Sequence, residues 1–303
     1  MIQPSDNDRV QKAVAWLMLG VTGGLMLDLF AKELLRTYSL EQFIFLRSLI
    51  AIVLLLAIAP RFGGFGSLRS NHKAWHLLRT VLSVGAMFGF FYGLSRMPLV
   101  NAFTLGYTAP LMMTGLSAIF LSEPVGWRRW TAVVFGFIGV MVMLRPGQGE
   151  LSFAAIAVLI AAFCYACQAI TARRLAGTES TLALSFYVVV GPMLVSATLL
   201  DSQSWLAPDP VDWGLLIGAG ASSVVAWIGF VNGYRAASPA LLAPLEYTAL
   251  IGGAVAGFVF WDEVPDRWVV TGALIIVGSG LFVVYRNNEI SELPQRTADN
   301  TSP

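Results

Sequence analysis

Tyr107-Thr108-Ala109, followed by Glu123, recurs in this sequence as Tyr247-Thr248-Ala249, followed by Glu263, at a spacing of 140 residues without a gap. Over the window from Val81 to Met143, 13 of 63 positions carry the same residue 140 positions later; they are Ser83, Val84, Ala86, Gly89, Phe90, Gly93, Leu105, Tyr107, Thr108, Ala109, Phe120, Glu123 and Thr131. Biased composition alone gives roughly one identity in ten. The chain therefore reads as a duplicated unit, and a duplication constrains the fold.

The composition is that of a polytopic helical membrane protein. Of the 303 residues, 56% are hydrophobic and only 12% are charged, and the mean hydropathy is +0.70. Soluble domains carry about a quarter charged residues. The net charge of +1 provides no basic field, so a nucleic-acid partner is not expected. Residues 287–303 read as a polar tail.

Apolar runs of about twenty residues, separated by Gly, Pro and charged residues, predict ten membrane-spanning helices. The runs are too long, and alternate too little, for spanning strands. The predicted helices cover residues 13–32, 41–59, 74–95, 98–121, 127–145, 152–173, 181–200, 211–234, 239–261 and 267–285. The fold class is therefore an all-α integral membrane protein.

The distribution of Lys and Arg predicts the orientation of these helices. Twelve of the 19 basic residues fall on the side of the N-terminus, five fall on the other side, and Arg47 and Arg79 lie within or at the mouth of helices. Both termini are therefore expected in the cytoplasm.

Each copy of the duplicated unit holds five helices, and five is an odd number. The second copy must then cross the membrane in the opposite sense to the first, as an inverted repeat. We expect a first repeat at residues 13–145, a second at 152–286 and a cytoplasmic tail at 287–303. Two halves that face opposite ways can exchange conformations, which is the physical basis of alternating access and favours a carrier.

Several short motifs resemble those of a known family. In the first repeat they are Arg96-Met97-Pro98, Glu123-Pro124, Gly136 and Gly139; in the second they are Ser238-Pro239, Glu263-Val264-Pro265, Gly278 and Gly280. The chain resembles the EamA family of the drug/metabolite transporter superfamily over about residues 13–286. Among its members, it looks most like the bacterial inner-membrane exporters of aromatic amino acids and related metabolites.

The resemblance implies a ten-helix basket around a central cavity. The first, third, fourth, sixth, eighth and ninth helices are expected to line the cavity, and the fifth and tenth to lie at the periphery, where they could support a homodimer. It also implies a secondary transporter with a small-molecule solute and no cofactor. Another carrier of the same superfamily, for a sugar, a nucleotide-sugar or a lipid, stays an alternative; a nucleotide-sugar site would want more deep cationic charge than Arg47 and Arg79 supply.

Glu246 is the clearest candidate for solute contact. It lies about eight residues into the ninth predicted helix, directly before the second Tyr-Thr-Ala, where the first copy has Gly106. A charge inside hydrocarbon costs at least about 2.5–3.5 kcal/mol, so it needs a reason. Either this carboxylate binds an ammonium group or a proton, or it pairs with Arg79 at a similar depth.

Asp28 and Arg47 occupy matching depths on the first and second predicted helices. We expect an ion pair or a shared hydrogen-bond network, and a role in helix packing is favoured over a role in solute binding. Lys32 and Glu33 are expected to be interfacial and solvated. His72 and His76 are expected in a loop or at the interface.

Proline within a helix leaves the carbonyl four residues earlier without its helical partner. Pro110 would do so for Gly106, and Pro244 for Ala240. Both prolines are expected to bend the motif helices, and the exposed carbonyls could bind solute or be satisfied by neighbouring hydroxyls or water.

Aromatic and amide side chains at mid-depth predict a cavity for an amphipathic, partly aromatic solute. Helix packing explains any one of them, and only the group favours a cavity. The residues expected to contact solute, together with Glu246, are Tyr247, Asn232, Trp227, Tyr107, Tyr92, Asn101 and Gln168.

Enzymatic and metal-binding functions are not expected. No phosphate-binding loop, zinc motif or Ser/His/Asp set stands out, and the short connections leave little room for soluble chemistry. Cys164 and Cys167 form a C-x-x-C inside an apolar helix, where small packing residues are the favoured interpretation. A membrane-embedded enzyme and a non-transporting sensor remain the competing classes.

Overall fold

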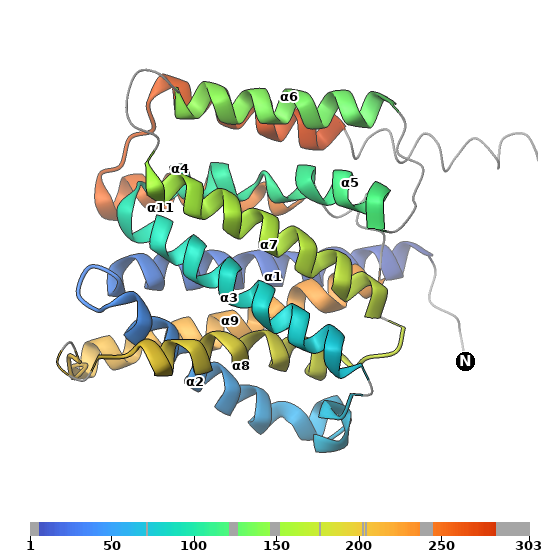
Figure 1. Cartoon of the computed structure of the whole chain (residues 1–303), viewed down its shortest axis with the longest axis vertical. Coiled ribbons are helices and arrows are strands. Elements are labelled where there is room, and N and C mark those ends of the chain that lie inside the picture. Colours follow the sequence, from blue (N-terminus) through green and yellow to red (C-terminus); the bar gives the residue numbers. More distant parts are fainter. Residues whose placement is uncertain are drawn as a thin grey trace, which may run out of the picture.

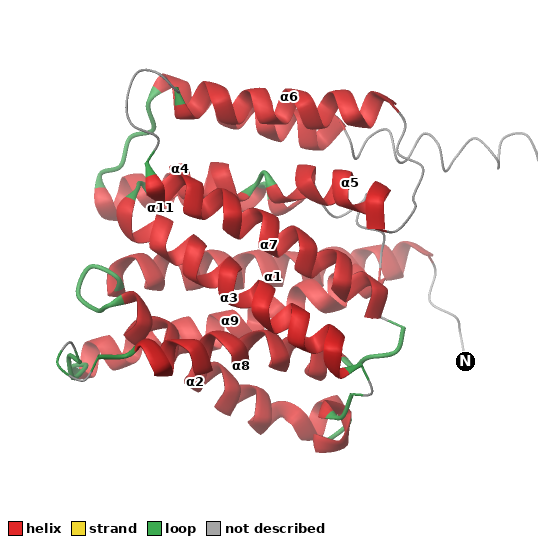
Figure 2. Cartoon of the chain, in the orientation of Figure 1, coloured by secondary structure: helices red, strands yellow, loops and turns green. Residues whose placement is uncertain are grey.

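The computed structural model describes residues 6–70, 72–120, 127–145, 152–175, 177–201, 203, 205–236 and 245–282. The described elements are helices, turns and loops, and no strand occurs among them (Figure 2). Glu123, Pro244 and the tail at 287–303 lie outside the described residues. Figure 1 shows long helices side by side in one bundle.

Eleven α-helices of the described part correspond to the ten predicted spans, because one span is divided into two helices. In chain order these are α1 (Asp6–Leu34), α2 (Leu40–Ile58), α3 (Lys73–Arg96), α4 (Leu99–Gly106), α5 (Ala109–Phe120), α6 (Trp127–Leu144), α7 (Phe153–Leu175), α8 (Thr181–Leu199), α9 (Pro210–Ala236), α11 (Thr248–Trp261) and a last helix, Arg267–Phe282. Short 3₁₀ turns, η1 (Ala59–Phe62) and η2 (Phe65–Leu68), connect α2 to α3. Six of these helices, α1, α2, α3, α7, α8 and α9, contain segments long and apolar enough to cross a bilayer.

The helix predicted over 98–121 is broken, and the prediction of one continuous helix was wrong there. The break falls on Tyr107 and Thr108, between α4 and α5. Pro110 has no N–H to donate to the carbonyl of Gly106, which removes one helical bond. The Thr108 hydroxyl donates to the Leu105 carbonyl at 2.6 Å and satisfies that group inside the bundle.

The second copy of the motif interrupts its helix in the same way. Leu245 and Glu246 are helical, Tyr247 is a turn, and α11 begins at Thr248. The Thr248 hydroxyl donates to the Leu245 carbonyl, again at 2.6 Å. The second copy has Leu250 in place of Pro110. The repeated threonine therefore serves both breaks, whereas the proline belongs to only one.

Two helix pairs pack with their backbones in direct contact. α1 runs along α9, and α3 runs along α7. A Cβ built at Gly229 of α9 would lie 2.4 Å from the Gly20 nitrogen of α1. A Cβ built at Gly89 of α3 would lie 2.6 Å from the Ala157 carbonyl oxygen of α7. Only glycine allows such an approach.

These contacts recur at a fixed spacing along the sequence. Gly89 and Gly229 are 140 residues apart, as are Gly93 and Gly233. Gly93 faces Ala154 and Val158 on α7. Gly233 faces Ala13 and Leu17 on α1, and these two residues lie 141 positions before Ala154 and Val158. The helix N-caps Ser39 of α2 and Ser180 of α8 are 141 residues apart.

α6 and the helix Arg267–Phe282 lie together at one edge of the bundle (Figure 1). They meet through Gly139 and Gly272, where a Cβ at Gly272 would lie 2.7 Å from the Gly139 carbonyl oxygen. Large apolar side chains on both helices are exposed, including Trp127, Val134, Phe135, Leu274 and Phe282. Inside a bilayer this face would contact lipid.

Gly229→Ala is expected to lower the stability of the fold by about 1–3 kcal/mol, because the added methyl group meets α1 backbone rather than a movable side chain. Thermal unfolding of the purified protein in detergent measures the change. Gly214→Ala is the matched control on the same helix, since nothing lies within 4 Å of a Cβ at that position. Equal melting temperatures for the two variants would contradict the close α1–α9 contact.

Candidate solute cavity

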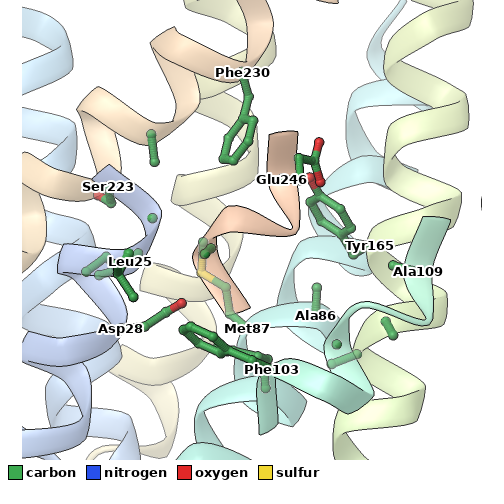
Figure 3. Close-up of a pocket in the computed structure, with 18 of the residues that line it drawn as sticks. Leu25, Asp28, Ala86, Met87, Phe103, Ala109, Tyr165, Ser223, Phe230 and Glu246 are labelled. Atoms are coloured by element: carbon green, nitrogen blue, oxygen red, sulfur yellow. The ribbon is translucent and has the colours of Figure 1, made fainter. Parts of the chain in front are cut away.

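A cavity of about 270 Å³ lies in the middle of the bundle (Figure 3). Both helix breaks contribute to its wall, through Gly106, Tyr107, Ala109 and Pro110 at the first and through Glu246 and Ala249 at the second. α1, α2, α3, α4, α7 and α9 supply the rest of the lining. Its size suits a small organic molecule.

The lining follows the internal duplication. Residues that are identical between the two copies line the cavity from both, namely Ser83 with Ser223, Ala86 with Ala226, Phe90 with Phe230 and Ala109 with Ala249. These pairs were visible in the sequence as identities at the 140-residue spacing. That spacing was the signal that could have identified Phe90, Phe230 and Ser223, which the sequence-based site left out.

Charged groups enter the cavity where the two copies differ. Glu246 corresponds to Gly106 in the first copy. Asp28 and Arg47 correspond to the uncharged residues Ala169 and Val188, which lie 141 positions later in the second copy. Figure 3 shows Asp28 reaching into the pocket from α1 and Glu246 from the segment before α11, with the Tyr165 ring on the side of α7. The wall is otherwise largely apolar and aromatic.

Arg47 is buried, with 1% of its surface exposed, and lines the cavity. Its Nη2 donates to Ser48 Oγ at 3.4 Å and lies 2.9 Å from Met87 Sδ, and its guanidinium carbon lies 5.6 Å from the centre of the Phe91 ring. Among the described residues nothing accepts a hydrogen bond from its Nε. The ion pair predicted with Asp28 is not formed as a direct contact, although both groups line the same cavity.

Arg79 has a different role from Arg47. Its Nη1 donates to the Gln168 carbonyl at 2.7 Å and its Nη2 to the Leu184 carbonyl at 3.3 Å, so it ties α3 to α7 and α8. Gln168 returns a bond from its side chain to the Arg79 carbonyl at 3.4 Å. Arg79 does not belong to the cavity lining, and these contacts do not favour its suggested pairing with Glu246.

The cavity gathers only part of the site predicted from the sequence. Glu246, Trp227, Tyr107, Gln168 and Pro110 line it, whereas Tyr92, Asn101, Asn232 and Tyr247 are not among the lining residues. Depth along a helix was the basis of the prediction, and depth does not determine which way a side chain faces. Pro244 lies outside the described residues.

Two of the predicted residues that do not line the cavity have defined contacts elsewhere. The Tyr92 ring packs edge-on against Phe153 at 5.6 Å, close to the end of α3, with Arg96 over its face. The Tyr247 ring lies 5.5 Å from the Tyr107 ring, and its hydroxyl points at Gly280 of the last helix. Tyr247 therefore supports Tyr107 from behind the cavity wall.

A polar junction lies on α1 one helical turn beyond the cavity-lining Asp28. Lys32 pairs with Glu263, and Glu263 Oε2 accepts a bond from the Leu99 amide at 2.8 Å. The expectation that Lys32 is solvated was wrong, because its side chain is only 9% exposed. The junction buries it between α1, α4 and the segment that follows α11. Glu33, by contrast, stays exposed and pairs with Arg36.

At the other end of α3, the two histidines share one carboxylate. His72 Nδ1 lies 2.9 Å and His76 Nε2 3.3 Å from Glu179, which also accepts a bond from Ser70 Oγ at 2.7 Å. The cluster joins the connection before α3 to the connection between α7 and α8. Burial works to raise the pKa of Glu179, but the bonds from Ser70, His72 and His76 outweigh it and hold that pKa below its ordinary value of 4.5.

Glu179→Gln is expected to destabilise the protein by about 1 kcal/mol at pH 7, because the amide cannot replace the charge-assisted bonds. A carboxyl group with a lowered folded-state pKa stabilises the fold above its unfolded pKa near 4.5 and loses that contribution as the pH falls through the folded value. The difference in melting temperature between wild type and variant should therefore shrink below about pH 4.5. Glu33→Gln is the control, and a difference that stays constant down to pH 3 would contradict the assignment.

Comparison with known proteins gives one family and several carriers. The chain matches the EamA-like transporter family twice, over residues 11–145 and 152–285. It is 28% identical to an S-adenosylmethionine uptake transporter of Rickettsia prowazekii over 90% of this chain and 92% of that protein. It is 31% identical to a riboflavin transporter of Vibrio cholerae, covering 77% and 79% of the two chains, and 24% identical to a pseudopaline exporter of Pseudomonas aeruginosa, covering 83% and 88%.

The fold also has a counterpart among solved structures. A crystal structure with 18% sequence identity superposes with a TM-score of 0.67 and covers 91% of this chain and 98% of the other. At this identity the likeness concerns the fold alone.

Proposed function

The chain belongs to the EamA-like transporter family and is a membrane transporter rather than an enzyme, and from that premise we propose that it carries a small zwitterionic solute that bears a planar ring. Amino acids with aromatic side chains are one such class. S-adenosylmethionine, the solute named for a relative, is another, because it joins an amino-acid end and a sulfonium centre to an adenine ring.

The observation that carries this proposal is the state of Arg47. A buried guanidinium normally has its donors satisfied, and leaving one unsatisfied costs free energy. Arg47 lines the cavity and, like Arg79, keeps a buried Nε without an acceptor among the described residues. A carboxylate is the group that best matches a guanidinium in geometry and charge. A solute carboxylate at Arg47 would therefore satisfy the donor.

The remaining lining accounts for the rest of the solute. Asp28 and Glu246 offer acceptors for an ammonium or sulfonium centre, and Phe90, Phe103 and Tyr165 offer faces for a planar ring. Two acidic side chains and one guanidinium suit a solute that brings both a cationic group and a carboxylate. This balance disfavours the alternative solutes, since a sugar or a lipid tail brings no positive charge to the cavity.

We also propose that the transporter works by alternating access between two inverted repeats at 13–145 and 152–286. Three observations support it: the double family match, the glycine contacts that recur at matching positions of α3 with α7 and α9 with α1, and the paired cavity lining. An arrangement in which α1 contacts α9 while α7 contacts α3 is what a two-fold axis in the membrane plane would give.

The setting of the transporter is proposed from the sequence. The excess of Lys and Arg on the N-terminal side supports a bacterial inner membrane with both termini in the cytoplasm. The exposed apolar faces of α6 and Arg267–Phe282 are compatible with the proposed homodimer. Export was the direction expected from the sequence; the relatives include both an uptake transporter and an exporter, so flux in both directions is the relevant measurement.

A flux assay in proteoliposomes tests the proposal. Radiolabelled S-adenosylmethionine and aromatic amino acids should each exchange across the membrane faster than in protein-free liposomes, with and without a pH gradient. Neutral sugars, presented at the same concentration, serve as the negative control. Transport of the sugar in preference to every zwitterion would overturn the proposed solute class.

Arg47→Met is expected to weaken solute binding by roughly 10- to 100-fold, because a charge-assisted hydrogen bond to the solute is lost. The melting temperature of the variant should be unchanged or raised. The second effect follows because the variant removes a buried cation that lacks an acceptor for one donor. Isothermal titration and thermal unfolding give the two readouts. A purely structural arginine would show the reverse, with a lowered melting temperature and unaltered affinity in the folded fraction.

Glu246→Gln should impair the transport of a solute that carries an ammonium or sulfonium group, by roughly tenfold in rate at low solute concentration. Glu33→Gln, an exposed carboxylate outside the cavity, is the matched control. Normal transport by a well-folded Glu246→Gln protein would remove Glu246 from the site.

A further inference from the structure

We propose that the junction of Lys32, Glu263 and the N-terminus of α4 is a gate, which must open for solute to pass at this end of the cavity. It holds together three cavity-lining elements that are otherwise far apart in the sequence. Lys32 donates to the Met97 carbonyl at 3.3 Å and pairs with Glu263, and Glu263 accepts the Leu99 amide at 2.8 Å. This inference rests on the transporter class and not on the identity of the solute.

The position of the junction relative to the cavity is fixed by helix geometry. Lys32 lies four residues after Asp28 on α1, and Leu99 lies four residues before Phe103 on α4. Four residues make about one helical turn, so both residues lie one turn beyond the lining, on the same faces of their helices. The gate therefore closes directly over the site at the C-terminal end of α1.

The backbone at the end of α11 places the Glu263 carboxylate in this junction. Asp262 adopts a left-handed conformation with φ of 53°, and the Glu263 amide returns to the Gly257 carbonyl at 3.0 Å, which folds the chain back over the helix end. Gly257 has no side chain between α11 and its neighbours: a Cβ there would lie 3.2 Å from Glu263 Oε2. The Trp261 ring lies 5.5 Å from Lys32 Nζ and covers the pair.

The bonds of this junction differ in kind from those that hold the helix pairs. α1 and α9 are in backbone contact through glycine and cannot separate without opening a void. α1 packs far less extensively against α11. An ion pair and two backbone contacts can be exchanged for water at an interface at a small net cost, because water replaces their hydrogen bonds. The bundle should therefore part here first, with α1 and α9 moving as one body away from α4 and α11.

Cysteine accessibility tests the gate without any solute. Ala86 lines the cavity on α3, so Ala86→Cys, with Cys164→Ala and Cys167→Ala, places a single thiol inside. A membrane-impermeant maleimide is applied to right-side-out and to inside-out vesicles. Glu263→Gln and Lys32→Gln are combined with this reporter. Glu33→Gln is the matched control: Glu33 bonds to Arg36 and to Trp261 Nε1 rather than to Lys32 or Glu263, and the amide oxygen of the variant can still accept the indole N–H.

Both gate variants should raise the labelling rate from the face at the C-terminal end of α1 by about five- to tenfold over the control, the shift in population expected from losing one charge-assisted bond. Labelling from the opposite face should not rise. Equal rates for Glu263→Gln, Lys32→Gln and Glu33→Gln would overturn the gate. If neither gate variant yields folded protein by size-exclusion chromatography while Glu33→Gln does, the junction is a structural bond and the proposal is also wrong. Loss of solute binding by Arg47→Met leaves this readout unaffected, so the two proposals fail independently.

Discussion

A backbone N–H or C=O within a bilayer must find its partner inside the protein, and the architecture of this chain follows from that requirement. Within the described spans, helices satisfy it except at the two Tyr-Thr-Ala motifs, where the helix is interrupted. At both interruptions a threonine hydroxyl donates to a carbonyl of the preceding helical turn, at the same 2.6 Å. Irregular backbone at this depth is tolerated where it borders a cavity, and both breaks do border one.

The close packing of the helix pairs α1–α9 and α3–α7 also depends on particular residues. Glycines of α3 and α9 bring these helices against the backbones of α7 and α1, and no larger residue would fit. Two tightly joined helix pairs result, one on each side of the cavity. Two polar contacts lie where one member of a pair meets an element outside it, namely Lys32 of α1 with Glu263 at one end and His76 of α3 with Glu179 at the other. A carrier needs such a division, because its packed bodies must persist while its ends open.

The cavity combines a symmetric frame with an asymmetric set of charges. Serine, alanine and phenylalanine enter from both copies of the duplicated unit, and they give similar walls to the two halves. Asp28, Arg47 and Glu246 have no charged counterpart in the other copy. In such a frame a few substituted positions would change the charge of the site without disturbing the fold.

The sequence by itself determined the membrane class, the approximate helix limits and the 140-residue duplication, because hydropathy and identity are properties of the chain alone. It indicated Glu246, Tyr107, Trp227 and Gln168 by their depth along the helices. It could not separate these from Tyr92, Asn101, Asn232 and Tyr247, since depth does not give the direction in which a side chain points. Only the tertiary structure decided that Arg47 faces the cavity while Arg79 binds the carbonyls of Gln168 and Leu184, and that Lys32 is buried against Glu263. Each of these outcomes depends on a helix distant in the sequence, whose position no local pattern encodes.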